Sequence, residues 1–379
     1  MEKVNCIDIV YYPNHNVILV PVTVNGIETY FQLDTGAPTS ISTEIFDTLN
    51  LVSINHHQGI DYYGNEKVVV ETIIPSLTIG DTEYKATKNS VVDVPQSFII
   101  CGHKLGGYLG SDFFMDKAVQ IDVSQKQLLI SNSVENFYLD DHFKQDFKIY
   151  FGQKSPFIFI HIPAIELVIE AEFDTGSSSD YLVINYDVKN KLIANDYIYP
   201  ENILDTLKRS DNGRGLFGKQ KDTLNFRFSV DSILLSGARF YNFPVLTADI
   251  DYSRLGSPIL RHGIVTVDFI NKHFFFKPSS SSTIDLLRSL DITFHYNENG
   301  FIVSSIREGS NLANTGIKVG YYLREVASIR LDTISECDFM LTDWKNIFAK
   351  KETIKLVFET PEGDIIDHEL VYSHILNGS

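Results

Sequence analysis

The sequence predicts a mainly β protein made of two homologous halves and a small α+β domain after them. Three observations support this prediction. Short apolar runs alternate with Gly, Asn and Asp turns about every ten residues through position 277, which is typical of short strands. Two long segments of the first half recur in the second. A Pro/Ser-rich stretch then precedes a segment in which strand and helix patterns alternate.

The strand pattern is clearest in a few runs rich in β-branched and aromatic residues. Three of them are Val17 to Val24, Val68 to Ile74, and His273 to Phe276. Helical spacing is rare in this part of the chain. The best case is the segment Ile41 to Leu49, whose apolar residues share one helix face and which Ser42 or Thr43 can cap.

The internal repeat consists of two matches in the same order. FQLDTGAPTS at residues 31–40 is echoed by AEFDTGSSSD at residues 171–180, and GYLGSDFFMDKAVQIDVSQKQLLIS from Gly107 is echoed by SRLGSPILRHGIVTVDFINKHFFFK from Ser253. Nearly equal offsets predict two homologous lobes. The domains that we expect are a first lobe at 1–137, a second lobe at 138–277, a linker at 278–283, and a small domain at 284–379. A surface loop within one domain is the alternative to the linker.

Composition excludes several classes of protein. The 49 acidic and 32 basic residues give a net charge of −17, which repels nucleic acid and anionic lipid, so we expect neither as a partner. The sequence contains no C-x-x-C or H-E-x-x-H, so we expect no metal. No apolar run approaches the roughly 20 residues of a membrane helix. The first residues do not resemble a signal peptide, so the printed chain predicts an intracellular protein, or a periplasmic or envelope protein if a signal was removed.

The triplet Asp-Thr-Gly occurs twice, at Asp34 and at Asp174. Each copy follows an apolar strand, so its carboxylate is held rigidly where the backbone must turn. The first of these strands, Ile27 to Leu33, follows an Asn-Gly hairpin turn. One copy alone is typical of a turn that ends a strand. Two copies within a repeat predict that a pseudo-twofold axis brings the two carboxyls face to face.

These triplets, together with Tyr108-Leu109-Gly110 and Arg254-Leu255-Gly256, resemble the aspartic proteases over about residues 15–277. The D-T-G-A copy looks like the retroviral (retropepsin) type and the D-T-G-S copy like the pepsin type. The resemblance implies a bilobal pepsin-like fold in which each hydrophobic-Gly segment crosses behind a catalytic loop. Arg254 departs from the family pattern, which has a hydrophobic residue at its position.

The resemblance also implies a mechanism that needs no cofactor. Asp34 and Asp174 would share one proton, because two adjacent carboxyls do not both ionise readily. One would take a proton from a water that attacks the scissile carbonyl, while the other donates to the carbonyl oxygen. The residues that would support this dyad are Thr35, Gly36, Thr175, Gly176 and Ser177.

The two triplets differ in the residue that follows them. Ser177 offers a hydroxyl toward Asp174, whereas Ala37 offers none toward Asp34. Fewer hydrogen-bond donors leave the pKa of a carboxyl higher. We therefore expect a pH optimum less acidic than that of a site with Ser on both sides.

Aspartic proteases cover the substrate with a flap, a hairpin whose tip often carries Tyr and Gly. Tyr62, Tyr63 and Gly64 lie at the matching place, and Tyr63 is the expected flap tyrosine; an ordinary β-turn is the alternative. The counterpart in the second lobe is GRGLFG, from Gly213 to Gly218. This segment also satisfies G-x-G-x-x-G. An alternating strand pattern rather than a helix follows it, so we reject a dinucleotide site.

The C-terminal segment, about residues 284–375, resembles a PDZ domain of the bacterial type in the run GFIVSSIREGSNLANTGIKVGYYLREVASIRL. PDZ domains bind an extended peptide by strand addition. The resemblance implies that the binding loop is Leu290, Asp291, Ile292, Thr293 and Phe294. Asp291 brings negative charge to this loop, which opposes tight binding of a C-terminal carboxylate. Substrate recruitment, docking against the lobes and a structural cap all remain open.

The function that we expect is hydrolysis of peptide bonds by an aspartic endopeptidase with Asp34 and Asp174 as its dyad. A polypeptide is the expected substrate, and a peptide or C-terminus is the expected ligand of the small domain. The alternative is a peptide-binding protein on a degenerate protease scaffold. A specialised processing enzyme would be silent on generic substrates and would resemble that alternative in a crude assay.

Overall fold

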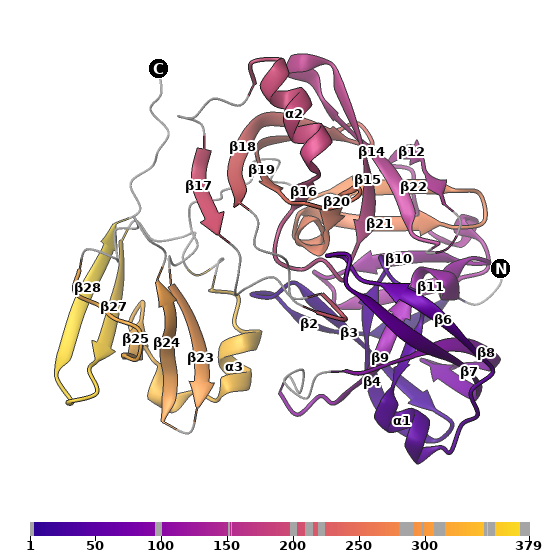
Figure 1. The fold of residues 1–379 in the computed structure, drawn as a ribbon, viewed down its shortest axis with the longest axis horizontal. Coiled ribbons are helices and arrows are strands. Elements are labelled where there is room, and N and C mark those ends of the chain that lie inside the picture. Colours follow the sequence, from indigo (N-terminus) through magenta and orange to yellow (C-terminus); the bar gives the residue numbers. More distant parts are fainter. Residues whose placement is uncertain are drawn as a thin grey trace. The chain divides into compact units, whose positions relative to one another are not determined.

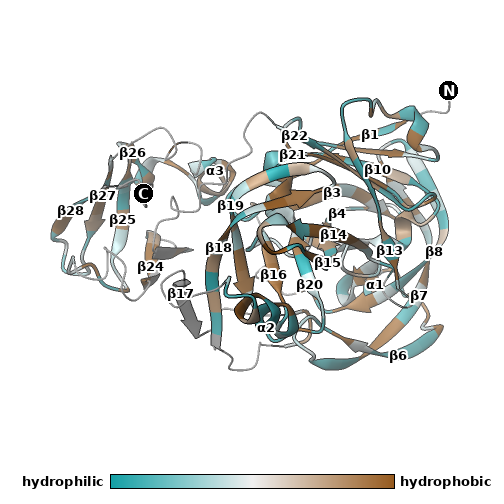
Figure 2. Ribbon diagram, turned by 90° about the horizontal axis from the view of Figure 1, so that it is seen from above, coloured by the Kyte–Doolittle hydropathy of each residue, from teal (hydrophilic) through white to brown (hydrophobic). Residues whose placement is uncertain are grey.

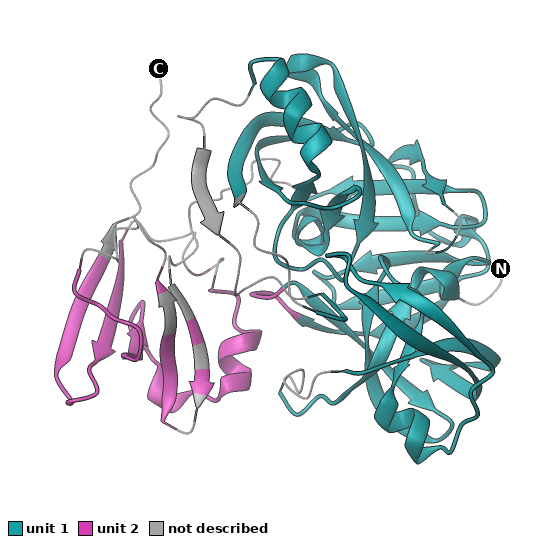
Figure 3. Ribbon diagram, viewed as in Figure 1, with its two compact units in different colours: residues 1–11, 16–284 teal, residues 12–15, 285–379 magenta. Residues whose placement is uncertain are grey.

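The computed structural model describes residues 4–94, 101–150, 152, 154–197, 203–208, 215–218, 224–279, 292–297, 299–306, 315–344, 347 and 353–371 (Figure 1). The chain forms two compact units, which Figure 3 colours separately. Unit 1 comprises residues 1–11 and 16–284, and unit 2 comprises residues 12–15 and 285–379. The described parts are mainly β, as the sequence predicts. None of their helices is long and apolar enough to cross a membrane.

Unit 1 contains two eight-stranded sheets with the same order of strands. Sheet 1 has the order β2-β3-β4-β9-β5-β8-β7-β6, and sheet 2 has the order β13-β14-β15-β20-β16-β19-β18-β17. The strands of sheet 1 are β2 (Val10–Tyr12), β3 (Val17–Val24), β4 (Ile27–Asp34), β5 (Ser40–Ser42), β6 (Asn55–Ile60), β7 (Glu66–Ile79), β8 (Thr82–Val92) and β9 (Leu105–Gly110). The strands of sheet 2 are β13 (Lys148–Ile149), β14 (Pro156–Ile162), β15 (Leu167–Asp174), β16 (Leu182–Ile184), β17 (Ile203–Lys208), β18 (Leu224–Leu235), β19 (Ala238–Thr247) and β20 (Ser253–Gly256). The sequence repeat is thus a repeat of topology.

A third sheet joins the two halves of unit 1. Its order is β1-β11-β10-β21-β22-β12, and the central pair, β10 and β21, takes one strand from each half. The strands are β1 (Asn5–Asp8), β10 (Ala118–Asp122), β11 (Gln127–Ser131), β12 (Phe143–Asp146), β21 (Gly263–Asp268) and β22 (His273–Pro278). The amide of Gln120 donates to the hydroxyl of Thr266 across this pair, at 2.8 Å. The ladder fixes the two halves against each other.

Short helices occupy equivalent places in the two halves. Helix α1 (Thr43–Thr48) follows β5, and its first turn is capped by the Ser42 hydroxyl, which accepts from the Ile45 N–H. Helix α2 (Tyr186–Ala194) follows β16 and is capped in the same way by Asn185. Short 3₁₀ helices follow both Leu-Gly segments, as η2 (Ser111–Phe114) and η6 (Ser257–His262). The further 3₁₀ helices are η3 (Val134–Asn136), η4 (Pro163–Ile165) and η8 (Leu331–Thr333).

The core of unit 1 explains why the two D-T-G strands are rigid. Apolar residues of β4, β9, β15 and β20 are fully buried around the strand ends; they are Phe31, Leu33, Leu109, Ala171, Phe173 and Leu255. Figure 2 shows hydrophobic residues concentrated along the strands of this unit. Burying each large side chain stabilises the fold by about 1.5–3 kcal/mol. The strands that end at Asp34 and Asp174 are therefore fixed by a packed apolar core.

Unit 2 has a sheet of its own in the order β23-β24-β25-β27-β28, with β26 paired to β25. Its strands are β23 (Ile292–Asn297), β24 (Gly300–Ile306), β25 (Tyr322–Val326), β26 (Ile329–Arg330), β27 (Thr353–Glu359) and β28 (Ile365–Val371). Helix α3 (Glu336–Leu341) is capped by Ser335. A separate apolar core includes Phe301, Trp344 and Phe358. Of the expected linker, Pro278 ends β22 and residues 280–283 lie outside the described part of the chain.

Candidate active site

Asp34 and Asp174 end equivalent strands and lie against one another. Parallel pairing places Asp34 opposite Gly110 and Asp174 opposite Gly256. A Cβ atom on Gly36 would lie 2.3 Å from Cγ of Asp174, and one on Gly176 would lie 2.5 Å from Cγ of Asp34. Each triplet therefore needs glycine, because the carboxyl of the other triplet fills the space beside it. We call Asp34 and Asp174 the dyad.

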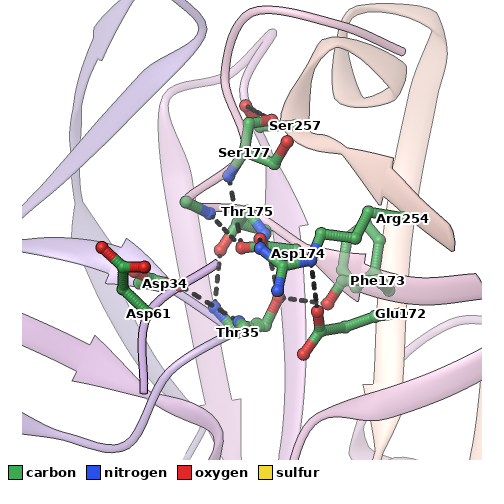
Figure 4. A network of polar contacts seen from close by, with 12 residues as sticks. Asp34, Thr35, Asp61, Glu172, Phe173, Asp174, Thr175, Ser177, Arg254 and Ser257 are labelled. Atoms are coloured by element: carbon green, nitrogen blue, oxygen red, sulfur yellow. Dashed lines mark hydrogen bonds and ion pairs between the residues drawn. The ribbon is translucent and has the colours of Figure 1, made fainter. Parts of the chain in front are cut away.

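Two threonines tie the triplets together by reciprocal hydrogen bonds. The Thr35 hydroxyl donates to the Phe173 carbonyl at 2.7 Å and accepts from the Thr175 N–H at 3.0 Å. The Thr175 hydroxyl donates to the Leu33 carbonyl at 3.0 Å and accepts from the Thr35 N–H at 3.0 Å. Both threonines are fully buried. The network (Figure 4) holds the two carboxyl-bearing loops in a fixed relation.

Backbone N–H groups orient the two carboxyls. Oδ1 of Asp34 accepts from the Gly36 N–H at 3.1 Å. Oδ1 of Asp174 accepts from Gly176 at 2.8 Å and from Ser177 at 3.2 Å. The Ser177 residue thus contributes through its backbone. The described contacts include no hydrogen bond from its hydroxyl to Asp174.

Burial and mutual repulsion of the two carboxyls favour a proton on the dyad. The pKa of Asp34 is raised well above its usual value. Burial is the largest cause, followed by the negative charge of Asp174 and a hydrogen bond between the two carboxyls. Asp174 itself is 4% exposed. The arrangement keeps one proton on the dyad at pH values at which a free carboxyl has lost it.

A buried charge network adjoins the dyad on the side of sheet 2. Arg254 places Nη1 at 3.1 Å from Oδ2 of Asp174 and Nε at 2.7 Å from Oε2 of Glu172 (Figure 4). Glu172 is 0% exposed and Arg254 is 8% exposed. Sequence reasoning noted Arg254 only as a break in the hydrophobic-Gly pattern, and it did not identify Glu172. One feature of the sequence could have identified both residues. Glu172 and Arg254 carry opposite charges, and each lies two residues before the end of a strand that flanks the dyad.

The expected flap is a hairpin between β6 and β7. Tyr62 places its ring 3.8 Å from the guanidinium carbon of Arg254, whereas Tyr63 packs beside Tyr62 with ring centroids 4.6 Å apart. Of the two tyrosines of this hairpin, Tyr62 is the one whose ring lies over Arg254 of the charge network, and the expectation that Tyr63 is a flap tyrosine stays a prediction. Gly64 has φ of 74°, in the left-handed region that favours glycine at a turn.

The two hairpins of the two halves meet through Asp61. Its Oδ1 accepts from the N–H groups of Tyr63 and Asn65 in its own turn, at 3.0 and 2.9 Å. Its Oδ2 accepts from the N–H groups of Phe217 and Gly218, at 2.9 and 3.1 Å. The Gly-rich segment that resembled a nucleotide fingerprint thus contacts the flap where the structure describes it. Residues 213 and 214 lie outside the described part of the chain.

The remaining candidate residues have simpler surroundings. Three further aspartates of the repeated segments have structural contacts: Asp122 and Asp268 accept from N–H groups of their own turns, and Asp112 accepts from the N–H and the hydroxyl of Thr39 in the loop after the first triplet. Among the residues that the structure describes, no group of three or more His, Cys, Asp or Glu side chains is placed to hold a metal. Ile292, Thr293 and Phe294 begin β23, the edge strand of its sheet, whereas Leu290 and Asp291 lie outside the described residues.

Comparison with known proteins finds a family profile that matches part of the chain and solved structures with low sequence identity to it. The profile of the aspartyl protease family matches residues 20–113, so this part of the chain is aspartyl protease-like. The basic 7S globulin from soybean is 11% identical, with a TM-score of 0.43, and the match covers 74% of this chain and 97% of that chain. Conglutin gamma, a basic 7S globulin from lupine seeds, is 10% identical, with a TM-score of 0.43 and coverages of 74% and 95%. No curated protein matches the chain.

Proposed function

We propose that this protein is an aspartic endopeptidase whose dyad is Asp34 and Asp174. The observation that carries the proposal is the pair of D-T-G carboxyls held against one another by the reciprocal threonine bonds. The raised pKa of Asp34 supplies the acid that such a mechanism needs. The bilobal, pepsin-like arrangement belongs to this proposal, with lobes at residues 1–137 and 138–277.

The reaction follows from the positions of the two carboxyls. The ionised carboxyl takes a proton from a water, whose oxygen attacks the scissile carbonyl carbon. The protonated carboxyl gives its proton to the carbonyl oxygen, which yields a gem-diol. When the C–N bond breaks, the amine takes the proton gained from water, and a diol hydroxyl returns a proton to the other carboxyl. Each carboxyl ends in its starting state.

Unit 2 is, in this proposal, a PDZ-like module that recruits or positions a polypeptide. Its antiparallel sheet ends in β23, and an edge strand is the place where an extended peptide adds by backbone hydrogen bonds. The expected binding loop, residues 290–294, runs into this strand, so we assign its backbone to peptide contact. The expected segment of residues 278–283 would link this module to the lobes.

The test is digestion of a reduced and alkylated protein between about pH 3 and pH 8 by the full chain and three variants. We expect Asp34→Asn and Asp174→Asn to lower the rate about 100-fold or more, because each removes one partner of the proton transfer. Asp122→Asn, which changes a carboxyl in a turn, should cleave like the wild type. Equal cleavage by the wild type and Asp34→Asn would overturn the proposal.

A second candidate function is peptide binding without cleavage on the same scaffold. The observation that favours it is the contact of Arg254 with Oδ2 of Asp174, which occupies an oxygen of the dyad. A wild type that cleaves nothing, yet binds unfolded peptides as tightly as Asp34→Asn does, would support this candidate over the enzyme.

A further inference from the structure

The dyad lies in a framework whose charges are not symmetric. At the register position two residues before each dyad carboxyl, sheet 1 pairs Gln32 with Tyr108, whereas sheet 2 pairs Glu172 with Arg254. Gln32 and Tyr108 are uncharged groups. Arg254 is a permanent cation in a buried place, and its guanidinium contacts Asp174, whereas the described contacts include no hydrogen bond or ion pair from it to Asp34. Asp174 is therefore in direct contact with a cation, whereas for Asp34 the charge of Arg254 is the smallest of the influences on its pKa.

Four side chains surround the guanidinium of Arg254. Glu172 pairs with Nε at 2.7 Å, and Asp174 pairs with Nη1 at 3.1 Å. The Tyr62 ring packs over the guanidinium at 3.8 Å, and the Tyr252 ring lies 5.7 Å away. A guanidinium bound in this way offers the neighbouring carboxylate a directed N–H, so it acts on Asp174 through geometry as well as charge.

The charge balance also favours Asp174 as the anion. One guanidinium serves two carboxyls, Glu172 and Asp174, and a third carboxyl, Asp34, lies beside them. Burial raises the pKa of Glu172 to about 7, so below that pH Glu172 carries a proton. Arg254 still donates a hydrogen bond from Nη1 to Oδ2 of Asp174, at 3.1 Å. Burial and the Asp174 charge favour the protonated form of Asp34.

We propose that Arg254 is a positioning residue that keeps Asp174 ionised and leaves the dyad proton on Asp34. The charge assignment stands on the structure alone, and its catalytic meaning rests on the proposed function. In that reaction Asp174 is the base that takes the proton of the attacking water, and Asp34 is the acid that protonates the scissile carbonyl oxygen. Glu172 and Tyr62 orient Arg254, so that every turnover starts with Asp174 as the base and Asp34 as the acid.

The test reads protonation directly in the full-length protein labelled with ¹³C at aspartate carboxyls. The signals absent from Asp34→Asn and from Asp174→Asn identify the dyad. At about pH 6, above the ordinary pKa of aspartate, we expect a protonated signal for Asp34 and an ionised signal for Asp174. In Arg254→Leu the chemical shifts of the two signals should become more alike, because the two carboxyls then share the proton. Arg254→Lys should restore the wild-type pattern in part.

Controls separate this effect from loss of structure. Arg324→Leu removes an Arg–Glu ion pair of unit 2 with the same 2.7 Å distance, and it should leave both dyad signals in place. If Arg254→Leu does not fold, the double variant Arg254→Leu with Glu172→Leu replaces the buried ion pair by apolar residues, a change that proteins often tolerate. Unchanged dyad signals in the folded Arg254 variant, or a protonated Asp174 in the wild type, would overturn the proposal.

Activity gives a second reading if the wild type cleaves peptides. Arg254→Leu should lower kcat at least about tenfold with KM changed less than about twofold, because the residue acts on the base rather than on the substrate. Arg254→Lys should recover part of kcat. Because the carboxyl signals are measured without substrate, a wild type without activity would contradict the proposed function and leave the charge assignment to be decided by the spectra.

Discussion

Sheet 1 and sheet 2 share one topology and one active-site triplet, yet they surround their carboxyls with different chemistry. In sheet 1 the residues beside the dyad are Gln32 and Tyr108, and in sheet 2 they are Glu172 and Arg254. The backbone needs only two strands and a glycine to place a carboxyl, so the framework tolerates both pairs. The difference teaches that symmetry of the fold does not impose symmetry of charge.

The largest effect that we expect concerns a feature that the two halves share, the reciprocal hydrogen bonds of Thr35 and Thr175. Thr35→Val removes the acceptor of the Thr175 N–H and the donor to the Phe173 carbonyl, and Thr175→Val removes the equivalent pair. Each variant leaves two buried polar groups unsatisfied, at about 1–3 kcal/mol per group. We therefore expect each to lower the free energy of unfolding by about 2–6 kcal/mol in urea denaturation.

The comparison predicts equal losses for these two threonines. Thr333→Val, whose hydroxyl donates to the Arg330 carbonyl in an exposed turn, is the control and should cost less than about 0.5 kcal/mol. Losses that differ by more than about 1 kcal/mol between Thr35→Val and Thr175→Val would show that the two halves depend unequally on the shared network.

The next effect concerns a difference between the halves, Glu172 in sheet 2 against Gln32 in sheet 1. It is tested by the pH dependence of the free energy of unfolding. The pKa of Glu172 is raised to about 7 from a usual value near 4.5, so between these values the folded chain holds a proton that the unfolded chain has released. Stability from this residue is complete below about pH 4.5 and is lost as the pH rises toward 7. The slope is at most about 1.4 kcal/mol per pH unit.

Glu172→Gln should reduce this slope, leaving the part that comes from the raised pKa of Asp34, and should make its position resemble Gln32 of sheet 1. The measurement is the free energy of unfolding at several pH values between about 4.5 and 7. Glu362→Gln, at an exposed turn position of unit 2, is the control and should leave the slope in place. A slope as steep in Glu172→Gln as in the wild type would show that Glu172 is not a linked group and would assign the whole slope to Asp34.

A smaller effect concerns the contact between the two hairpins. Asp61→Asn replaces a carboxylate oxygen with an amide, so it cannot accept from Tyr63 and Asn65 on one side and from Phe217 and Gly218 on the other. We expect the Phe217 and Gly218 amides to exchange with solvent about tenfold faster. Asp122→Asn, whose bonds stay within one turn, should not change their exchange. Unaltered exchange in Asp61→Asn would mean that other contacts hold the hairpins together.

The sequence predicts the framework better than the charges within it. Local patterns are sufficient for β3, which spans Val17–Val24 as predicted, and for the Asn25-Gly26 turn, where both residues have positive φ. The repeat indicates which two carboxyls pair. Glu172, in contrast, lies among alternating polar residues of β15 that periodicity assigns to solvent, and only the parallel register with β20 places it beside Arg254. Such a pairing between distant strands has no local signal.

The smallest effect returns to the residues after the two triplets, Ala37 and Ser177. Sequence reasoning assigned the difference to the Ser177 hydroxyl, whereas the structure has Asp174 accepting from the Ser177 N–H. Ala37→Ser should therefore lower the pKa of Asp34 by less than about half a unit, and Ser177→Ala should change the dyad as little. Carboxyl ¹³C titration measures both. A larger fall in Ala37→Ser would mean that the hydroxyl does reach the carboxyl, and that the asymmetry of the dyad depends on this residue as well as on Arg254.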